Sequence, residues 1–196
     1  MTLARRGRAS NVVVTCALAL VALGPRASAQ QASRPGELLI APVPSGWKVG
    51  SEDTRGANQQ VTELIPEDQT LERWTRMITV QTYRGATDRD PMDMVAGLAD
   101  RLKRLCPGLV VDREPQGPSQ PERSLRGSLR CQGGESKIVL AIQGRDAFYY
   151  VLYQWRGAED ATAELRAGNA YLDTVRVCDA RTTGCGDLQG VAVPSK

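Results

Sequence analysis

The sequence predicts an α+β fold in which a single, mostly antiparallel β-sheet of about six to seven strands carries helices packed on its faces. Two observations support this prediction. Residues 137–143 and 147–155 are apolar at almost every position, as expected for central strands that are covered on both sides. Two further segments, residues 91–105 and 159–175, place apolar side chains at helical spacing and supply that cover.

The N-terminal half is predicted to hold short strands that are separated by proline and glycine turns. The expected strands are residues 37–41, 47–50, 59–65 and 77–83. Ahead of the last of these, Asp68 is expected to cap a short helical turn that runs to Trp74. Trp74 would then anchor this turn to the sheet.

The first long helix has the clearest start signal in the sequence. Asp90 is placed as the N-cap and Pro91 as the first helical residue, while Pro107 and Gly108 end the pattern. One stripe of this helix is expected to pack on the sheet, formed by Val95, Leu98, Leu102 and Leu105.

The C-terminal half continues with two candidate strands, residues 109–113 and 125–131. Alternation in the second strand places Leu125 and Leu129 on the face that meets the first helix. Residues 144–146 form a hairpin loop between the two central strands. The second helix is expected to cover the opposite face of the sheet with Ala161, Leu165, Leu172 and Val175.

Residues 1–29 show the three regions of a cleavable secretory signal peptide. Basic residues precede an apolar run at residues 12–23, and the small residues of Ala27-Ser28-Ala29 predict cleavage after Ala29. The apolar run is shorter than the about 20 residues that a membrane-spanning helix needs. We therefore expect a periplasmic or secreted protein with no stable membrane span after cleavage.

Three parts are predicted to follow the signal peptide. They are a flexible lead-in at 30–36, a single α+β domain at 37–178 and a disulfide-closed C-terminal tail at 179–196. The signal peptide holds four of the 25 basic residues and no acidic one, which leaves 21 basic against 22 acidic residues, a net charge of about −1. Nucleic acid is therefore not an expected partner.

Four cysteines remain after cleavage: Cys106, Cys131, Cys178 and Cys185. An even number in an oxidising compartment predicts two disulfides, for which three pairings exist. The short loop between Cys178 and Cys185 favours that pair, and Cys106 is then left to pair with Cys131. A four-thiolate zinc site is disfavoured because the cysteines lack paired C-x-x-C spacing.

The complete absence of histidine excludes several chemistries. Ser-His-Asp and Cys-His catalysis and His-ligated zinc all require an imidazole. The sequence also lacks a phosphate-binding P-loop and a G-x-G-x-x-G motif. We therefore predict no catalytic residue, no metal and no cofactor.

Three weaker patterns can be explained without a catalytic or metal-binding role. Ser45 and Lys48 match the S-x-x-K pair of penicillin-recognising enzymes, but they lie in a proline and glycine turn where those enzymes have a helix. Asp88, Asp90 and Asp93 could form a calcium site, but their spacing lacks the loop glycine and the terminal glutamate of an EF-hand. A carboxylate pair for glycoside hydrolysis could come from four acids around one turn: Glu63, Glu67, Asp68 and Glu72. Acidic residues around a turn are usually solvated, which disfavours this site.

A set of aromatic residues is the candidate ligand or partner surface: Trp74, Tyr83, Tyr149, Tyr153 and Trp155. Such residues provide large contact areas at binding sites. The competing interpretation, which we favour, is that the aromatic residues of the central strand form core beneath a helix.

Several short runs resemble a group of small secreted bacterial proteins of uncharacterised function. The runs are residues 63–66 (ELIP), 74–75 (WT), 78–81 (ITVQ) and 106–108 (CPG). The order of elements is similar to the Mog1/PsbP-like fold, a curved antiparallel sheet flanked by helices. That resemblance implies an accessory or binding role, as in photosystem assembly factors and transport adaptors.

The expected function is therefore an exported, non-catalytic binding or accessory protein. Its partner is expected to be an unknown protein or a small apolar ligand of the cell envelope. The alternative is a His-independent envelope hydrolase that uses carboxylates or a Ser/Lys pair.

Overall fold

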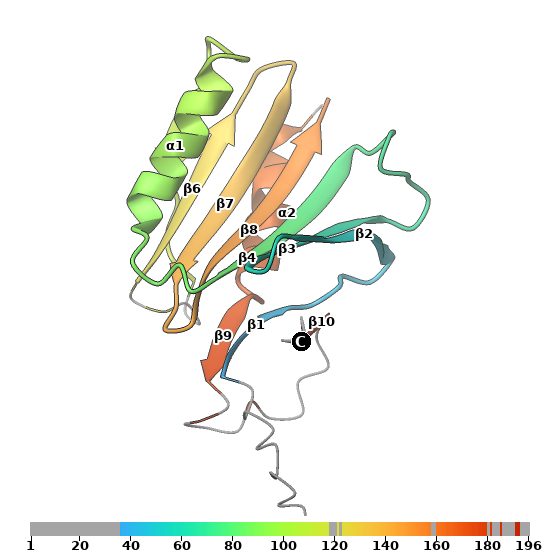
Figure 1. Ribbon diagram of the computed structural model, residues 1–196. Helices are drawn as coiled ribbons and strands as arrows, with labels where there is room; N and C mark the ends of the chain where they lie inside the picture. The colour runs from blue at the N-terminus through green and yellow to red at the C-terminus, as the bar shows by residue number, and fades with distance from the viewer. Residues whose placement is uncertain are drawn as a thin grey trace, which may run out of the picture. The chain divides into compact units, whose positions relative to one another are not determined.

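The computed structural model of the protein describes residues 36–117, 121, 123–157, 160–179, 181, 185 and 191–192 (Figure 1). The predicted signal peptide with its cleavage site at Ala29, and the lead-in up to residue 35, lie outside the described residues. No helix among the described residues is long and apolar enough to cross a membrane.

A seven-stranded sheet forms the centre of the fold, with the order β2-β3-β4-β8-β7-β6-β5. Every neighbouring pair in it is antiparallel. This confirms the predicted strand-rich, antiparallel architecture. The strands are β2 (Trp47–Arg55), β3 (Gln59–Pro66), β4 (Arg76–Arg84), β5 (Val110–Arg113), β6 (Ser124–Arg130), β7 (Glu135–Gln143) and β8 (Ala147–Arg156).

A second sheet corrects the expectation that all strands share one sheet. It has three strands in the order β10-β1-β9, where β1 is Glu37–Ala41, β9 is Arg176–Asp179 and β10 is Val191–Ala192. Pro42 and Pro44 separate β1 from β2, and proline cannot donate a ladder hydrogen bond, so β1 leaves the main sheet and pairs elsewhere. Residues 191–192, predicted as part of a tail, thus form a strand on β1.

The central position of β7 and β8 explains their continuous apolar sequence. Ile138, Leu140 and Val151 point to one face of the sheet, while Val139 and Phe148 point to the other, and all five are fully buried. Each face therefore has its own core, as predicted for strands that are covered on both sides.

Helix α1 (Pro91–Lys103) lies on the near side of β6 and β7 in Figure 1. Asp90 caps it, as predicted, and its side chain accepts a hydrogen bond of 2.7 Å from the backbone N–H of Met92. Val95 is buried in one cluster with Leu125 and Leu129, the two β6 residues expected to face this helix. The prediction for Leu105 is wrong: the helix ends at Lys103, and the Leu105 side chain is 84% exposed in the turn that follows.

Helix α2 (Ala161–Leu172) lies on the far side of the sheet, against β7 and β8. Its buried residues are Glu164, Gly168, Tyr171 and Leu172, whereas Ala161, predicted to face the sheet, is exposed. Gly168 allows the close approach, because a Cβ there would lie 2.8 Å from side-chain atoms of Ile138 and Tyr153. The inward face of α2 is thus partly polar.

The predicted short helical turn before β4 is wrong. Residues 67–74 form turns with an isolated bridge between Thr70 and Arg73. The side chain of Gln69 closes this loop, since its Oε1 accepts from the N–H of Thr75 at 2.7 Å and its Nε2 donates to Thr75 Oγ1 at 2.9 Å. Trp74 is buried beside Ile65, so it still anchors the segment to the sheet.

The cysteines pair as predicted. Cys106–Cys131 joins the end of the α1 segment to the end of β6, and Cys178–Cys185 closes a loop that begins on β9. Disulfides of this kind are typical of proteins in oxidising compartments.

Candidate functional site

An ion pair between the buried Glu164 and the half-exposed Arg76 joins α2 to the sheet. Glu164, in the first turn of α2, is 6% exposed, and its carboxylate accepts hydrogen bonds from Arg76 Nη2 at 2.7 Å and Nε at 2.9 Å. Tyr153 Oη of β8 donates to the second carboxylate oxygen at 3.0 Å. The hydrogen bond to Glu164 raises the pKa of the Arg76 guanidinium, and burial raises the pKa of the Tyr153 phenol. The buried charge is therefore fully compensated.

A pocket of about 530 Å³ lies beside this pair. Its ten lining residues come from the β1–β2 connection, β2, β4, β8, α2 and the turn after α2: Pro42, Pro44, Trp47, Arg76, Tyr153, Ala163, Glu164, Ala167, Tyr171 and Thr174. Sites for small molecules typically measure about 300–1,000 Å³ and are lined mainly by apolar and aromatic side chains. This pocket fits that description.

The helical wall of the pocket is one stripe of α2. Ala163, Ala167 and Tyr171 are four residues apart, so they lie along one side of the helix and span about 12 Å at 1.5 Å per residue. The two alanines leave space that larger side chains would fill. Trp47 also lines the pocket, and its ring centroid lies 6.2 Å from that of Tyr153. The lining of the pocket is therefore largely apolar and aromatic.

Tyr171 carries a buried hydroxyl beside this wall. The residue is 8% exposed, and its hydroxyl has no hydrogen-bond partner among the described residues. Burial raises the pKa of the phenol, so it is neutral at physiological pH. A buried hydroxyl without a partner costs about 1–3 kcal/mol. This oxygen is fully buried and does not face the pocket.

The predicted aromatic set is divided among three places. Tyr153 lines the pocket, whereas Tyr149 and Trp155 are buried in the core on the same face of the sheet. Tyr83 packs on the opposite face, with the Arg89 guanidinium 5.3 Å from its ring centroid. Trp74 belongs to a third cluster and stacks at 3.7 Å under the Arg156 guanidinium. Only Tyr153 therefore reaches the candidate pocket.

Sequence reasoning missed the nine other lining residues, among them Trp47, Arg76, Glu164 and Tyr171. A usable signal was present in α2, where Glu164, Gly168 and Tyr171 recur at helical spacing beside Leu172. A search for apolar stripes passes over a face that contains an acid and a glycine.

The weaker patterns of the sequence have local roles. Ser45 lies in an exposed turn, and Lys48 donates from Nζ to the backbone oxygen of Glu67 at 2.7 Å. Glu63 accepts from Ser51 Oγ at 2.7 Å. Glu72 is exposed, and a hydrogen bond from Thr70 lowers its pKa. Within the described part of the chain, no group of three or more acidic or cysteine residues is arranged to hold a metal ion.

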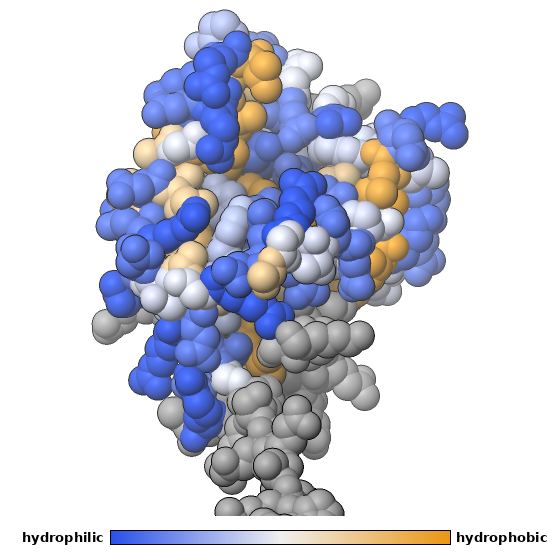
Figure 2. All heavy atoms as spheres, viewed as in Figure 1, coloured by the Kyte–Doolittle hydropathy of each residue, from blue (hydrophilic) through white to orange (hydrophobic). Residues whose placement is uncertain are grey.

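The face of the sheet that carries α1 is mostly hydrophilic (Figure 2). A hollow of about 410 Å³ lies on this face, over β3, β4 and β8. Its central amide is already bonded, because Gln154 donates to Thr79 Oγ1 at 2.8 Å and accepts from Lys137 Nζ at 3.1 Å. These groups are occupied with one another, which makes this hollow the weaker candidate.

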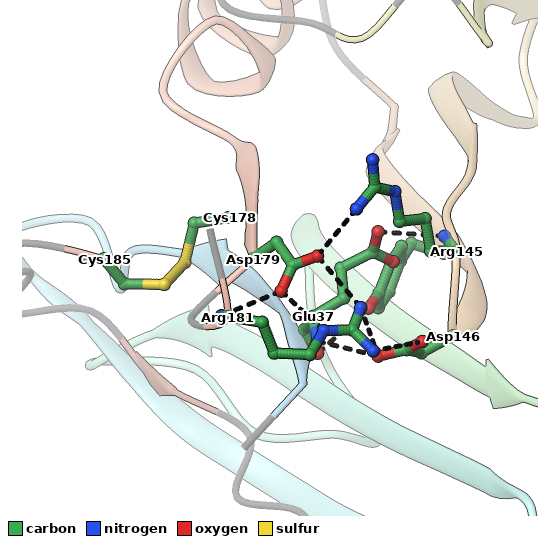
Figure 3. Close-up of polar contacts among 8 residues, drawn as sticks. Glu37, Arg145, Asp146, Cys178, Asp179, Arg181 and Cys185 are labelled. Carbon is green, nitrogen blue, oxygen red and sulfur yellow. Dashed lines mark hydrogen bonds and ion pairs between the residues drawn. A yellow bond between two sulfur atoms is a disulfide. The ribbon is translucent and has the colours of Figure 1, made fainter. Parts of the chain in front are cut away.

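A charged cluster near the Cys178–Cys185 disulfide ties β1, β9 and the β7–β8 loop together (Figure 3). Arg181 bonds to Asp179 at 2.8 Å and lies 3.1 Å from an oxygen of Asp146. The N–H of Glu37 donates to Asp146 at 2.9 Å, and Arg145 pairs with Asp179 at 3.2 Å. Its acids and arginines are thus bonded to each other, which indicates a structural clasp.

No protein-family model matches the chain, and no curated protein matches it significantly.

Proposed function

We propose that the protein is an exported, non-catalytic binding or accessory protein of the bacterial periplasm or extracellular space, and that it holds a small apolar ligand in the pocket beside α2. The observation that carries this proposal is the 530 Å³ pocket, which combines apolar and aromatic walls with a compensated ion pair. Concave, mostly apolar sites with a few convergent polar groups are the usual form of ligand-binding sites.

The chemistry of the pocket favours binding over catalysis. Glu164 accepts from both Arg76 and Tyr153, so its carboxylate is occupied as a hydrogen-bond acceptor. The residues of the alternative hydrolase, Ser45 with Lys48 or the turn acids, are not among the residues that line this pocket. No observation gathers them at another site that would favour hydrolysis.

The proposed location rests on the signal-peptide pattern and on the two disulfides. The resemblance to Mog1/PsbP-like proteins supports an accessory role, since that fold is associated with binding more than with catalysis. Fold analogy alone is weak support for a function, so the pocket carries the argument.

The test compares two alanines of α2. Ala167 lines the pocket, whereas Ala170 is not among its lining residues; both are exposed helical alanines, so both tolerate leucine in the fold. N-phenyl-1-naphthylamine, an uncharged dye that fluoresces in apolar surroundings, is titrated into the mature protein. We expect saturable binding that Ala167→Leu weakens at least about tenfold, equivalent to about 1.4 kcal/mol, and that Ala170→Leu leaves unchanged.

Either of two results would contradict the proposal: no saturable dye binding to the unmodified protein, or equal binding by both variants. Capture of the tagged protein from its native envelope fraction, followed by mass spectrometry of small molecules, then identifies the natural ligand. A ligand carried through purification by the Ala170→Leu variant, but not by Ala167→Leu, is expected.

A further inference from the structure

We infer that the turn after α1 docks reversibly on a bilayer that contains anionic phospholipid, with the Leu105 side chain inserted at the boundary between headgroups and acyl chains. The inference goes beyond the proposed function, because Leu105 is not among the residues that line the pocket beside α2. It follows from an exposed apolar side chain, a turn that is held in place and the basic residues around it.

Leu105 is the most exposed large apolar side chain among the described residues. It is 84% exposed, whereas Met92, the next most exposed, is 50% exposed. Val110 and Val111 follow at the start of β5 and are also exposed. Three of the five exposed large apolar residues of the described chain therefore lie within positions 105–111. Exposed apolar groups that gather in this way mark interaction surfaces for membranes or proteins.

The backbone of this turn is held in place. The Leu102 carbonyl oxygen, near the end of α1, accepts from the N–H of Leu105 at 2.9 Å and from the N–H of Cys106 at 2.8 Å. The disulfide between Cys106 and Cys131 ties the turn to the end of β6. Because the turn is already ordered, little conformational entropy is lost when Leu105 enters another phase.

The charges beside Leu105 are mainly positive. Arg101, Lys103 and Arg104 are exposed just before it, and Asp100 is the single acidic residue between positions 100 and 111. Three basic residues minus one acidic residue give this segment a net charge of +2, whereas the chain after the predicted cleavage site carries about −1. The Lys103–Asp100 pair is exposed and 3.5 Å long, so it neutralises the lysine only weakly. The segment is therefore attracted to an anionic surface.

A bilayer fits these features better than a protein partner does. A stable protein interface needs a complementary surface of about 1,000 Å² or more. Fluid lipid adapts to a single protruding side chain, while lysine and arginine keep their charged ends among the headgroups. One apolar residue together with a basic cluster supplies the two weak signals that reversible membrane binding requires.

Sedimentation with vesicles tests the inference on the mature protein. The vesicles contain either phosphatidylcholine alone or equal amounts of phosphatidylcholine and phosphatidylglycerol. We expect the protein to sediment with the anionic vesicles and to remain in solution with the neutral ones. Leu105→Ser should weaken binding at least about fivefold, because the inserted side chain is lost. The matched control is Met92→Ser, which removes an exposed apolar side chain at the other end of α1 and should leave binding unchanged.

The basic residues are tested separately. Lys103→Gln/Arg104→Gln should weaken binding to the anionic vesicles at least about tenfold, and about 0.5 M NaCl should release the unmodified protein. All these side chains are exposed, so unfolding in urea should show that each variant is as stable as the unmodified protein.

Three results would overturn the inference. The first is no sedimentation of the unmodified protein with anionic vesicles, and the second is an equal loss of binding in Leu105→Ser and Met92→Ser. The third is capture from the envelope fraction of a protein that Leu105→Ser no longer retains, without any binding to vesicles, which would assign this surface to a protein partner. Dye binding in the pocket beside α2 should be unchanged in Leu105→Ser, so the proposed function and this inference stand or fall separately.

Discussion

Replacing Arg76 with methionine should destabilise the protein by about 2 kcal/mol. The substitution leaves the carboxylate of Glu164, whose side chain is 8% exposed, with Tyr153 as its remaining donor. Removing one partner of a fully buried ion pair costs about 3–5 kcal/mol. The Arg76 side chain is 52% exposed, so water reaches the vacated position and part of that cost is screened. These two considerations together give a value near 2 kcal/mol.

Unfolding in urea with the disulfides intact measures this cost. An unchanged slope of the free energy of unfolding against urea concentration verifies that the variant and the unmodified protein undergo the same transition. The control is Arg55→Met, because Arg55 and its partner Asp53 are 65% and 54% exposed. That substitution should cost less than about 0.5 kcal/mol. The double variant Arg76→Met/Glu164→Leu removes both charges and should be more stable than Arg76→Met alone, since no unpaired carboxylate is left buried. A cost for Arg76→Met no greater than that of Arg55→Met would refute this reasoning.

Three further predictions follow from glycine packing, a disulfide and a titrating acid. Gly168→Ala should lower the free energy of unfolding in urea by about 1–3 kcal/mol because its Cβ would lie 2.8 Å from side-chain atoms of Ile138 and Tyr153. Gly97→Ala in α1, where a Cβ would meet no atom outside its own helix within 4 Å, should raise it by about 0.5–1 kcal/mol; changes of the same sign would contradict this. Replacing Cys106 and Cys131 by serine should lower the free energy of unfolding by about 2–4 kcal/mol. Equal urea midpoints for this variant and the unmodified protein would contradict that expectation. The bonds from Arg181 lower the pKa of Asp179 from 3.8 to about 2, so the contribution of this acid to the clasp is complete above pH 3.8 and is lost as the pH falls through about 2. Amide chemical shifts near the Cys178–Cys185 loop should follow that titration and lose it in Asp179→Asn, while a transition centred near 4 would be inconsistent with the clasp.

The strongest local signals in the sequence predicted the fold well. Two uninterrupted apolar runs identified β7 and β8 as central strands, because only a strand covered on both faces tolerates that composition. Asp90 and Pro91 located the start of α1, since capping depends on residues that are adjacent in the chain. The disulfide pairing followed from the short separation of Cys178 and Cys185.

Features that depend on distant contacts were not predictable in the same way. The separate sheet of β1, β9 and β10 brings together residues from opposite ends of the domain, so no local sequence pattern predicts it. In the loop before β4, the bonds from Gln69 to Thr75 override the weak helical tendency of the segment. Leu105 fits the apolar stripe of α1 in sequence but lies beyond the end of the helix.

The candidate site shows why such a pocket is difficult to recognise from sequence. Arg76 and Glu164 are separated by 88 residues and meet only because β4 pairs with β8 and α2 returns across the same face. Their contact fixes one end of α2 on the sheet, and Gly168 sets the close approach to Ile138 and Tyr153 in the next turns of the helix. The alanines on the neighbouring stripe contribute little to this attachment, so the space beside them is not required for folding. The attachment of α2 to the sheet therefore depends on Arg76, Glu164 and Gly168, whereas the proposed ligand binding is expected to depend on Ala167. A substitution at Ala167 should therefore change binding with little effect on unfolding, whereas Arg76 and Glu164 both line the pocket and help to attach α2.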